Sequence, residues 1–515
     1  MIGFGSDAFI ASLAIIGIVI VVSALLSGFI ERSGLPQVAV FLAIGAALGP
    51  AGVGVVDIGL QSPSLHVVAT LSLTLVLFTD AVALNVSEVR KHWTLAVRLL
   101  GPGTLLSAAL VAFAGWWLLR LPVPAAAILG AALASTDPVL LRGLLRRKDI
   151  ASNTRQALQL ESGLNDVVLL PVVIVAMAFM GERAPGDGAA WAKLGLNLFI
   201  LGPGAGVAVG LVAVAALDLI RKKIGVRRDY ESLYSLGIAF SAYAAAEAVH
   251  GSGFLAAFAA GLTIAALDVE LCDCFLEYGA VTAEMMLLFT FVLFGSSLIW
   301  TGFSVISVAT LIFAAFVILI RPPVYLLSLL GSTVDRRGRF LIAWFGPRGL
   351  SSLLLILLPI FAGLPGAEQL FPICSLVVLL SVVLHGGSPL VLAQVDRRRA
   401  RHETAAANLS DNSGPAQPAS CVEGSAPDCV TGIESAQTPT AEVESFTVGR
   451  HSLTLEEVKR LQQSEQQVFI LDVRTERSLD DRQAQSAIRV PPDEAVSVVR
   501  RLGLLKEAWL IAYCA

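Results

Sequence analysis

Long apolar segments alternate with short polar ones from the N-terminus to about residue 395. Most of the apolar segments approach or exceed the roughly 18 to 20 residues that an α-helix needs to cross a bilayer. Their hydropathy pattern predicts thirteen transmembrane helices. The predicted spans are about 8–30, 36–56, 65–86, 94–119, 123–145, 154–179, 194–220, 231–249, 253–269, 280–299, 302–329, 338–362 and 370–395.

Basic residues favour one side of the predicted membrane. The loops after odd-numbered spans and the segment after the last span hold most of the lysines and arginines that flank the spans. The loops after even-numbered spans hold only Arg120, Arg183 and Lys193. The positive-inside rule therefore predicts an N-terminus outside and a C-terminus in the cytoplasm. We expect a multi-pass protein of the plasma membrane, the inner membrane of a bacterium.

The composition agrees with a membrane protein and excludes other classes. Of the 515 residues, 56% are hydrophobic and 15% are charged, and the net charge is −4. Because the basic residues gather in particular loops, the charge pattern gives no indication of a nucleic-acid partner. The six cysteines show neither a zinc-binding spacing nor a disulfide framework. We therefore expect no resident cofactor or structural metal.

Five ionisable side chains fall inside the predicted spans at similar depths. At about 1.5 Å per helical residue, Asp137, Glu161, Asp166, Arg321 and Arg348 lie between roughly 10 and 18 Å from the predicted cytoplasmic edge. A charge at the bilayer centre costs about 2.5–3.5 kcal/mol on insertion scales, so such residues occur where they pair or have a function. The sequence predicts one charge-paired cluster that contains an ion site.

Two predicted spans contain helix-breaking residues at the same depth. Pro138 lacks an N–H group and clashes with the preceding turn, so span 123–145 should break just before it. The Gly346-Pro347-Arg348-Gly349 segment should break span 338–362 in the same way. Freed carbonyls and half-helix ends bind ions in transporters built from inverted repeats. We predict such a repeat with two crossed discontinuous helices; the alternative is that these residues merely kink their helices.

These motifs resemble a known family. Thr136-Asp137-Pro138, the Asn165-Asp166 pair and the Gly346–Gly349 segment are similar to the sodium/proton exchangers of the cation/proton antiporter superfamily. The Asn-Asp pair resembles the branch that is thought to be electroneutral. The resemblance covers about residues 8–395. It implies an all-α membrane fold, usually a homodimer, that exchanges Na⁺ or K⁺ for H⁺.

The resemblance implies a cation/proton site formed by Asp166, Asn165, Ser162, Thr136 and Asp137. In that family the aspartate matching Asp166 alternately holds an alkali cation and a proton, and the residues matching Ser162 and Thr136 supply oxygen ligands, Thr136 through its backbone. Helical spacing also places Ser162 and Asp166 on one face. A proton and a hard monovalent cation compete for the same carboxylate oxygens. The alternative is that Asp166 is only the structural partner of another cationic group.

The remaining buried charges have structural roles by the same resemblance. The residue matching Glu161 forms a buried salt bridge with the arginine matching Arg321. Asp137 and Arg348 match the charges that compensate the dipoles of the broken helices. The helix itself supports this division, because Glu161 and Asp166 are five residues apart and diverge by about 140°. Glu161 is thus free to pair with an arginine while Asp166 points elsewhere.

The chain changes character after the membrane region, 1–396. Residues 397–446 are rich in small and polar residues, which predicts a disordered cytoplasmic linker. In residues 447–515 the pattern predicts a helix near 452–458 and strands at 468–471 and 509–513, the second of which ends at Cys514. This order resembles a small α/β rhodanese-like sulfurtransferase domain, in which the cysteine matching Cys514 carries a persulfide. The chain ends one residue later, so we expect an incomplete, inactive domain.

The sequence as a whole predicts a secondary antiporter whose partners are Na⁺ or K⁺, H⁺ and membrane lipids. Two alternatives belong to other classes. One is a membrane-tethered sulfurtransferase or redox-regulated module whose helices only anchor it. The other is a cation-coupled carrier of an organic solute. Thirteen spans with intramembrane charges are far more than an anchor needs, which favours the antiporter.

Overall fold

A computed structural model describes residues 17, 21, 25 and 37–386, apart from residues 85, 139–140, 142–149, 182–187, 224–227, 268–272 and 333, together with three strands near the C-terminus. The predicted span 8–30 lies almost entirely outside these residues. So do the predicted linker 397–446, the predicted helix near 452–458 and Cys514. The chain divides into two compact units, Met1–Pro415 and Ala416–Ala515.

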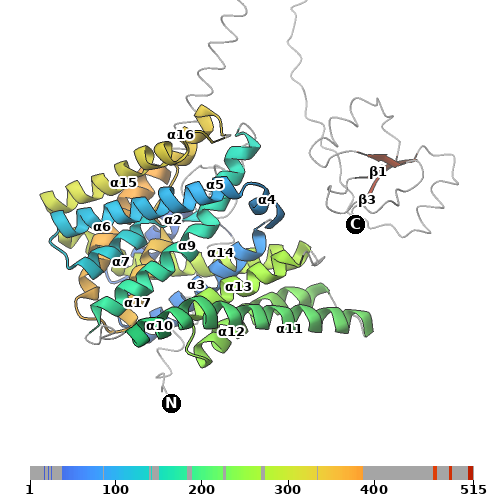
Figure 1. The fold of residues 1–515 in the computed structure, drawn as a ribbon, viewed down its shortest axis with the longest axis horizontal. Coiled ribbons are helices and arrows are strands. Elements are labelled where there is room, and N and C mark those ends of the chain that lie inside the picture. The colour runs from blue at the N-terminus through green and yellow to red at the C-terminus, as the bar shows by residue number, and fades with distance from the viewer. Residues whose placement is uncertain are drawn as a thin grey trace, which may run out of the picture. The chain divides into compact units, whose positions relative to one another are not determined.

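The described part of the first unit is helical (Figure 1). Its α-helices are α2 (Gln37–Leu48), α3 (Pro63–Ala83), α4 (Val86–Lys91), α5 (Trp93–Arg98), α6 (Leu106–Leu118), α7 (Val123–Ala134), α9 (Ser152–Met180), α10 (Gly188–Leu196), α11 (Gly202–Lys223), α12 (Arg228–Ala248), α13 (Gly253–Ala266), α14 (Asp273–Ser296), α15 (Val308–Ser328), α16 (Arg336–Trp344) and α17 (Leu350–Phe361). There are also two π-helical turns, η1 (Leu99–Leu105) and η2 (Asn197–Leu201), and two 3₁₀ turns, η3 (Leu298–Val305) and η4 (Ala367–Gln369). The last helix of the described residues in this unit is 370–386.

Six helical segments of the described residues are long and apolar enough to cross a membrane. They are Pro63–Ala83, Trp93–Leu118, Asn153–Met180, Gly188–Ile220, Val308–Ser328 and Ala367–Gly386. The pair Met285–Ser296 and Leu298–Val305 bends by 49° and makes a seventh if it is counted as one broken span. Each segment overlaps a span expected from hydropathy. The total of thirteen spans and the inverted repeat stay predictions.

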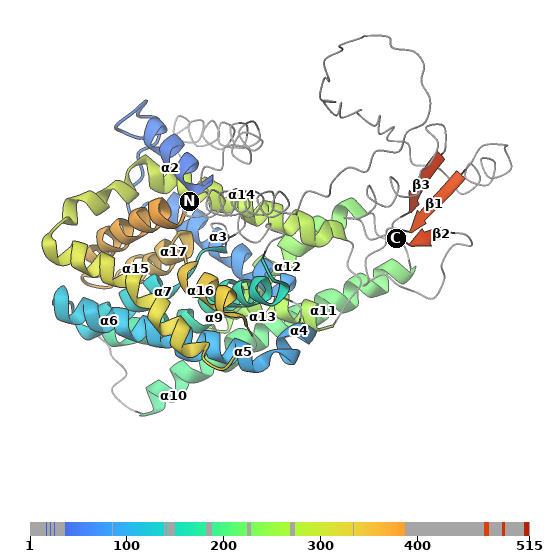
Figure 2. The ribbon, with the colours of Figure 1, turned by 90° about the horizontal axis from the view of Figure 1, so that it is seen from above.

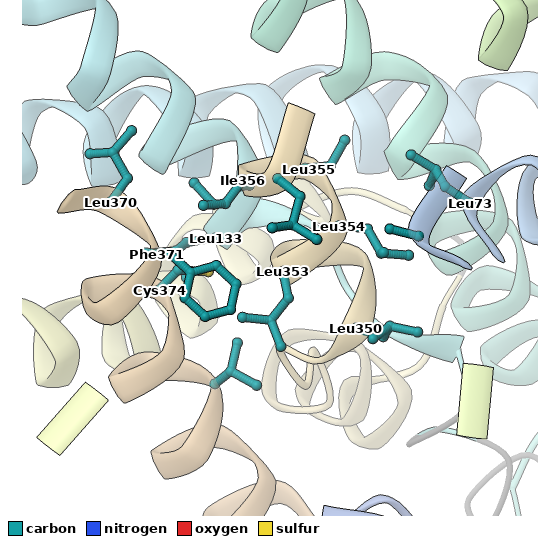
Figure 3. Close-up of a cluster of buried hydrophobic side chains, with 14 of the residues drawn as sticks. Leu73, Leu133, Leu350, Leu353, Leu354, Leu355, Ile356, Leu370, Phe371 and Cys374 are labelled. Carbon is teal, nitrogen blue, oxygen red and sulfur yellow. The ribbon is translucent and has the colours of Figure 1, made fainter. Parts of the chain in front are cut away.

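The bundle has apolar residues both inside and outside. The side chains of α17 are buried between Leu73 of α3 on one side and Leu370 and Phe371 of the last helix on the other (Figure 3). The helices α6 and α15 pack together and still expose large apolar groups such as Phe113 and Leu319. An apolar exterior around buried polar groups is the distribution that a bilayer requires.

Both predicted helix breaks are confirmed. The helix α7 ends at Ala134, and residues 135–137 are not helical. The helix α16 ends at Trp344, and α17 begins only at Leu350. The two breaks touch, because the backbone N–H of Asp137 donates to the carbonyl of Pro347 at 2.9 Å. Figures 1 and 2 show α7 beside α17 within the bundle.

The second unit contains a parallel sheet of three strands. They are β1 (Val468–Asp472), β2 (Ala487–Arg489) and β3 (Trp509–Tyr513), in the order β2-β1-β3. Val468 lies opposite Trp509 and Asp472 opposite Tyr513. The two strands expected from the sequence are therefore confirmed. A parallel sheet of this kind occurs in many α/β folds, so the rhodanese-like character stays a prediction.

Candidate functional site

The crossing of the two broken helices brings the five predicted intramembrane charges into one region. Asp137 follows α7, Glu161 and Asp166 lie in α9, Arg321 lies in α15, and Arg348 lies between α16 and α17. Each of these side chains is at most 3% exposed. Because buried charges are costly unless they are paired or hydrogen-bonded, the partner of each one matters.

Arg348 holds the C-terminal end of α7. Its Nε donates to the carbonyl of Leu133 at 2.7 Å, and its Nη2 donates to the carbonyl of Val317 at 3.4 Å. The other terminal nitrogen, Nη1, donates to the carbonyl of Gly346. A cation at a helix C-terminus interacts favourably with the carbonyls that have no partner within the helix. The break in one discontinuous helix therefore supplies the positive charge that the other half-helix end needs.

Asp137 holds the N-terminal end of α17. Its Oδ2 accepts a hydrogen bond from the backbone N–H of Leu350 at 2.8 Å, and Leu350 is the first residue of α17. A carboxylate at a helix N-terminus satisfies a free N–H group and opposes the helix dipole. Each break therefore supplies a charged side chain that binds the helix end at the other break.

The tight fit around Asp137 gives a testable prediction. A Cβ added at Gly349 would overlap the Asp137 carboxylate. We expect Gly349→Ala to displace this carboxylate from the N-terminus of α17 and to destabilise the fold by about 1–3 kcal/mol, as overpacking does. Thermal unfolding in detergent measures the loss. The matched control is Gly204→Ala, where a new Cβ meets nothing within 4 Å, and equal stability of the two variants would contradict the prediction.

Glu161 and Arg321 form a buried, bidentate ion pair. The distances are 3.1 Å from Nη1 to Oε1 and 3.0 Å from Nη2 to Oε2. Arg321 also lies over the ring of Tyr325, 3.9 Å from its centroid, and the hydroxyl of Tyr325 donates to Glu161 Oε1 at 2.9 Å. Paired hydrogen bonds between a guanidinium and a carboxylate are strong and directional. The Glu161 carboxylate therefore already has a fixed counter-charge.

Thr136 and Asn165 connect this ion pair to the neighbourhood of Asp166. The Thr136 hydroxyl donates to Glu161 Oε1 at 3.1 Å and accepts a hydrogen bond from Asn165 Nδ2. The same Nδ2 lies 3.5 Å from the Thr136 carbonyl. Within the described part of the chain, Asn165 Oδ1 is a buried oxygen that has no hydrogen-bond donor. Buried polar atoms are normally paired, so this oxygen is available to a ligand.

Asp166 has hydroxyl groups as its neighbours. Its Oδ1 accepts a hydrogen bond from the Ser135 hydroxyl, and the side chain of Ser351 in α17 also hydrogen-bonds to it. Among the described residues no lysine, arginine or histidine forms an ion pair with Asp166. The two buried carboxylates of α9 thus differ: Glu161 is paired with a cation, and Asp166 is surrounded by neutral oxygen groups.

Of the predicted site residues that the structure describes, all except Ser162 are linked at this crossing by the contacts above. Ser162 is buried, but its hydroxyl donates to the carbonyl of Gln159 at 3.4 Å and makes no hydrogen bond to Asp166. Sequence reasoning missed Ser135 and Ser351, although Ser135 directly precedes the Thr136-Asp137-Pro138 motif. Nothing in the sequence singles out Ser351 among the many serines of the apolar segments.

The fold and the site define a multi-pass helical membrane protein with a buried, charge-paired centre at two crossed helix breaks. A family model described as "Sodium/hydrogen exchanger, transmembrane" matches residues 18–393. The chain belongs to this sodium/hydrogen exchanger family.

Curated relatives and a solved structure agree with this assignment. The "K(+)/H(+) antiporter NhaP2" of Shewanella sp. (strain MR-4) is 28% identical over 385 residues, and the "K(+)/H(+) antiporter NhaP" of Alkalimonas amylolytica is 26% identical over 381. Each match covers 73% of this chain but only 65% of the relative. The sodium proton antiporter MjNhaP1 from Methanocaldococcus jannaschii has the same fold, with a TM-score of 0.60, 20% identity, and coverage of 74% of this chain and 99% of that one.

Proposed function

We propose that this chain is a secondary antiporter that exchanges Na⁺ or K⁺ for H⁺ by competition at Asp166. The observation that carries the proposal is that Asp166 is a buried carboxylate with hydroxyl neighbours and no cationic partner among the described residues, in a member of the sodium/hydrogen exchanger family. Such a group can take up a proton or a cation, but binding of a cation expels the proton. The relatives named as K⁺/H⁺ antiporters support the same activity.

The oxygen atoms around Asp166 suit a hard monovalent cation. The carboxylate supplies the charge, and the Ser135 and Ser351 hydroxyls and the Asn165 amide oxygen supply neutral oxygens. Hard cations prefer oxygen ligands of these types. We also retain the backbone carbonyl of Thr136 as a ligand, since it lies in the non-helical segment beside Asn165.

The other buried charges keep this site in place and do not exchange ions. The Glu161 carboxylate is held by Arg321, and Asp137 and Arg348 each bind the end of a half-helix. Of the five buried charges at the crossing, this leaves Asp166 to carry a proton or a cation. A site loaded with either ion is neutralised, whereas an empty charged site is costly to move through a low-dielectric region. A proton gradient would therefore drive the cation in the opposite direction.

The remaining features of the protein follow from the sequence and the family resemblance. We propose a homodimer in a bacterial inner membrane, with the N-terminus outside and the C-terminus in the cytoplasm. Residues 1–396 form the transport domain, 397–446 a linker, and 447–515 a rhodanese-like domain that acts as a binding or regulatory module. The three parallel strands of the second unit are compatible with this domain.

Reconstitution in liposomes tests the proposed exchange. With an imposed pH gradient and a trapped pH-sensitive dye, we expect Na⁺ or K⁺ to evoke proton movement, and a series with Na⁺, K⁺ and Li⁺ measures selectivity. Cys514→Ser should leave this movement unchanged, because Cys514 belongs to the C-terminal tail. Cation transport without proton movement, or proton movement that depends on Cys514 and not on added cations, would contradict the proposal.

A further inference from the structure

Two buried hydroxyl groups extend the polar network beyond the residues that the proposed exchange uses. Tyr325 of α15 and Thr104 of η1 are both completely buried, and their oxygens lie 3.0 Å apart. We propose that Thr104 and Tyr325 are positioning residues, which orient Glu161 and, through it, Thr136 and Asn165 at the ion site. This inference rests on the proposed function and deepens it.

The local backbone explains why Thr104 reaches Tyr325. Thr104 lies in η1, a π-helical turn that contains Pro102 and follows α5 without a break. Its hydroxyl lies 3.2 Å from the carbonyl of Leu99, within the same turn. The Tyr325 ring packs closely against Gly103. A Cβ added at Gly103 would lie only 3.2 Å from the ring. Single π-helical turns within α-helices are frequent at functional sites, and here the widened turn presents a hydroxyl to the network.

Each hydroxyl group in this network has one proton to donate, and this limits which oxygen donates and which accepts. Glu161 Oε1 accepts from Arg321 at 3.1 Å, from Tyr325 at 2.9 Å and from Thr136 at 3.1 Å. A tyrosine hydroxyl has one proton, so Tyr325 donates it to Glu161 and its oxygen can only accept. The single proton of Thr104 is then shared between the Tyr325 oxygen at 3.0 Å and the Leu99 carbonyl at 3.2 Å. Thr136 likewise donates its proton to Glu161.

The same reasoning sets the orientation of Asn165. Because the Thr136 hydroxyl has given its proton to Glu161, its oxygen can only accept, and it accepts from the amide nitrogen of Asn165. The amide oxygen of Asn165 therefore points away from Thr136 and is the buried acceptor that has no donor in the described part of the chain. The two amide atoms are assigned from this network, as is usual for asparagine. The bonds from Asn165 through Thr136 to Glu161 thus determine which amide atom faces a ligand, and Tyr325 contacts the Glu161 oxygen at which they end.

The hydroxyl of Tyr325 can be tested separately from its ring. Tyr325→Phe keeps the aromatic face over Arg321 and removes the hydroxyl that donates to Glu161 and lies 3.0 Å from the Thr104 hydroxyl. In liposomes that contain the full chain, we expect the half-saturating cation concentration to rise by about threefold to tenfold, because a hydrogen bond to a charged group is lost. The maximal rate should change less, and the pH profile of exchange should shift. The control is Tyr234→Phe, which removes a tyrosine hydrogen bond to the Ala213 carbonyl, away from these residues.

Thr104 variants test whether the two hydroxyls act in series. Thr104→Val should raise the half-saturating concentration by less than Tyr325→Phe, and Thr104→Ser should restore the wild-type value. Because Thr104 acts only through Tyr325, the double variant should equal Tyr325→Phe alone. If Tyr325→Phe matches both wild type and Tyr234→Phe, or if the two effects simply add, the inference is wrong while the proposed function stands. If the wild-type chain shows no cation-coupled proton movement, both are wrong.

Discussion

Asp166→Asn is expected to abolish cation-evoked proton movement in vesicles with an imposed pH gradient, while the amount of folded protein stays close to that of wild type. Asparagine has nearly the shape of aspartate and can still hydrogen-bond to the Ser135 and Ser351 hydroxyls that surround this position. It cannot carry the negative charge that binds either a proton or an alkali cation. The complete loss of exchange without a loss of folding is the signature of a transporting group.

A second carboxylate provides the control for this variant. Glu368 in η4 is exposed and accepts a hydrogen bond from Gln61 at 2.5 Å, outside the buried centre. Glu368→Gln should leave the rate of exchange and its dependence on cation concentration unchanged. If Asp166→Asn retained exchange at a rate similar to Glu368→Gln, competition at Asp166 could not be the mechanism, and another carboxylate would have to carry the proton.

Replacing Arg321 with methionine should have the largest effect on stability. The substitution leaves the Glu161 carboxylate completely buried without its counter-charge, and breaking a buried ion pair in this way costs about 3–5 kcal/mol. We expect a large decrease in the yield of folded protein and in the thermal unfolding temperature in detergent. Arg98→Met is the matched control, because Arg98 donates to the backbone carbonyl of Leu330 and its loss should cost about 1 kcal/mol.

Removal of both charges separates the ion pair from the packing of its side chains. In the double variant Arg321→Met with Glu161→Gln, neither position of the former ion pair carries a charge. We expect this variant to unfold at a higher temperature than Arg321→Met alone. A double variant as unstable as the single one would show that the guanidinium stabilises the fold through its other contacts, with the Ile342 carbonyl and the Tyr325 ring.

The broken helices show how far local chemistry in the sequence predicts the fold. Pro138 and the Gly346–Gly349 segment interrupt helices for steric reasons that act within a few residues, so both breaks could be located without knowledge of the neighbours. Long apolar runs are also a local property of the sequence. The spans expected from them overlap the long apolar helical segments of the described residues. Hydropathy does not determine how many of these spans pack into one bundle, so the total of thirteen transmembrane helices stays a prediction.

The hydroxyl groups around Asp166 show where that reasoning ends. Helical periodicity placed Ser162 on the same face as Asp166, but periodicity describes one helix and says nothing of its neighbours. In the folded protein Ser135 and Ser351 reach Asp166 from two other segments, and Ser162 bonds to its own helix. Tyr325 was within reach of sequence reasoning, since it is four residues from Arg321. Thr104 was not, because it comes from a separate part of the chain.

The sequence by itself determined the class of protein, the position of the buried charges and the sites at which two helices break, because hydropathy, charge and the geometry of proline act locally along the chain. The family resemblance already implied that Glu161 pairs with Arg321, and only the tertiary structure decided which oxygen groups surround Asp166. Arg321 comes from α15 and bonds to Glu161, whereas Asp166 meets hydroxyls from the crossing of the two breaks. That choice depends on how distant helices pack, and packing is a property of the whole fold.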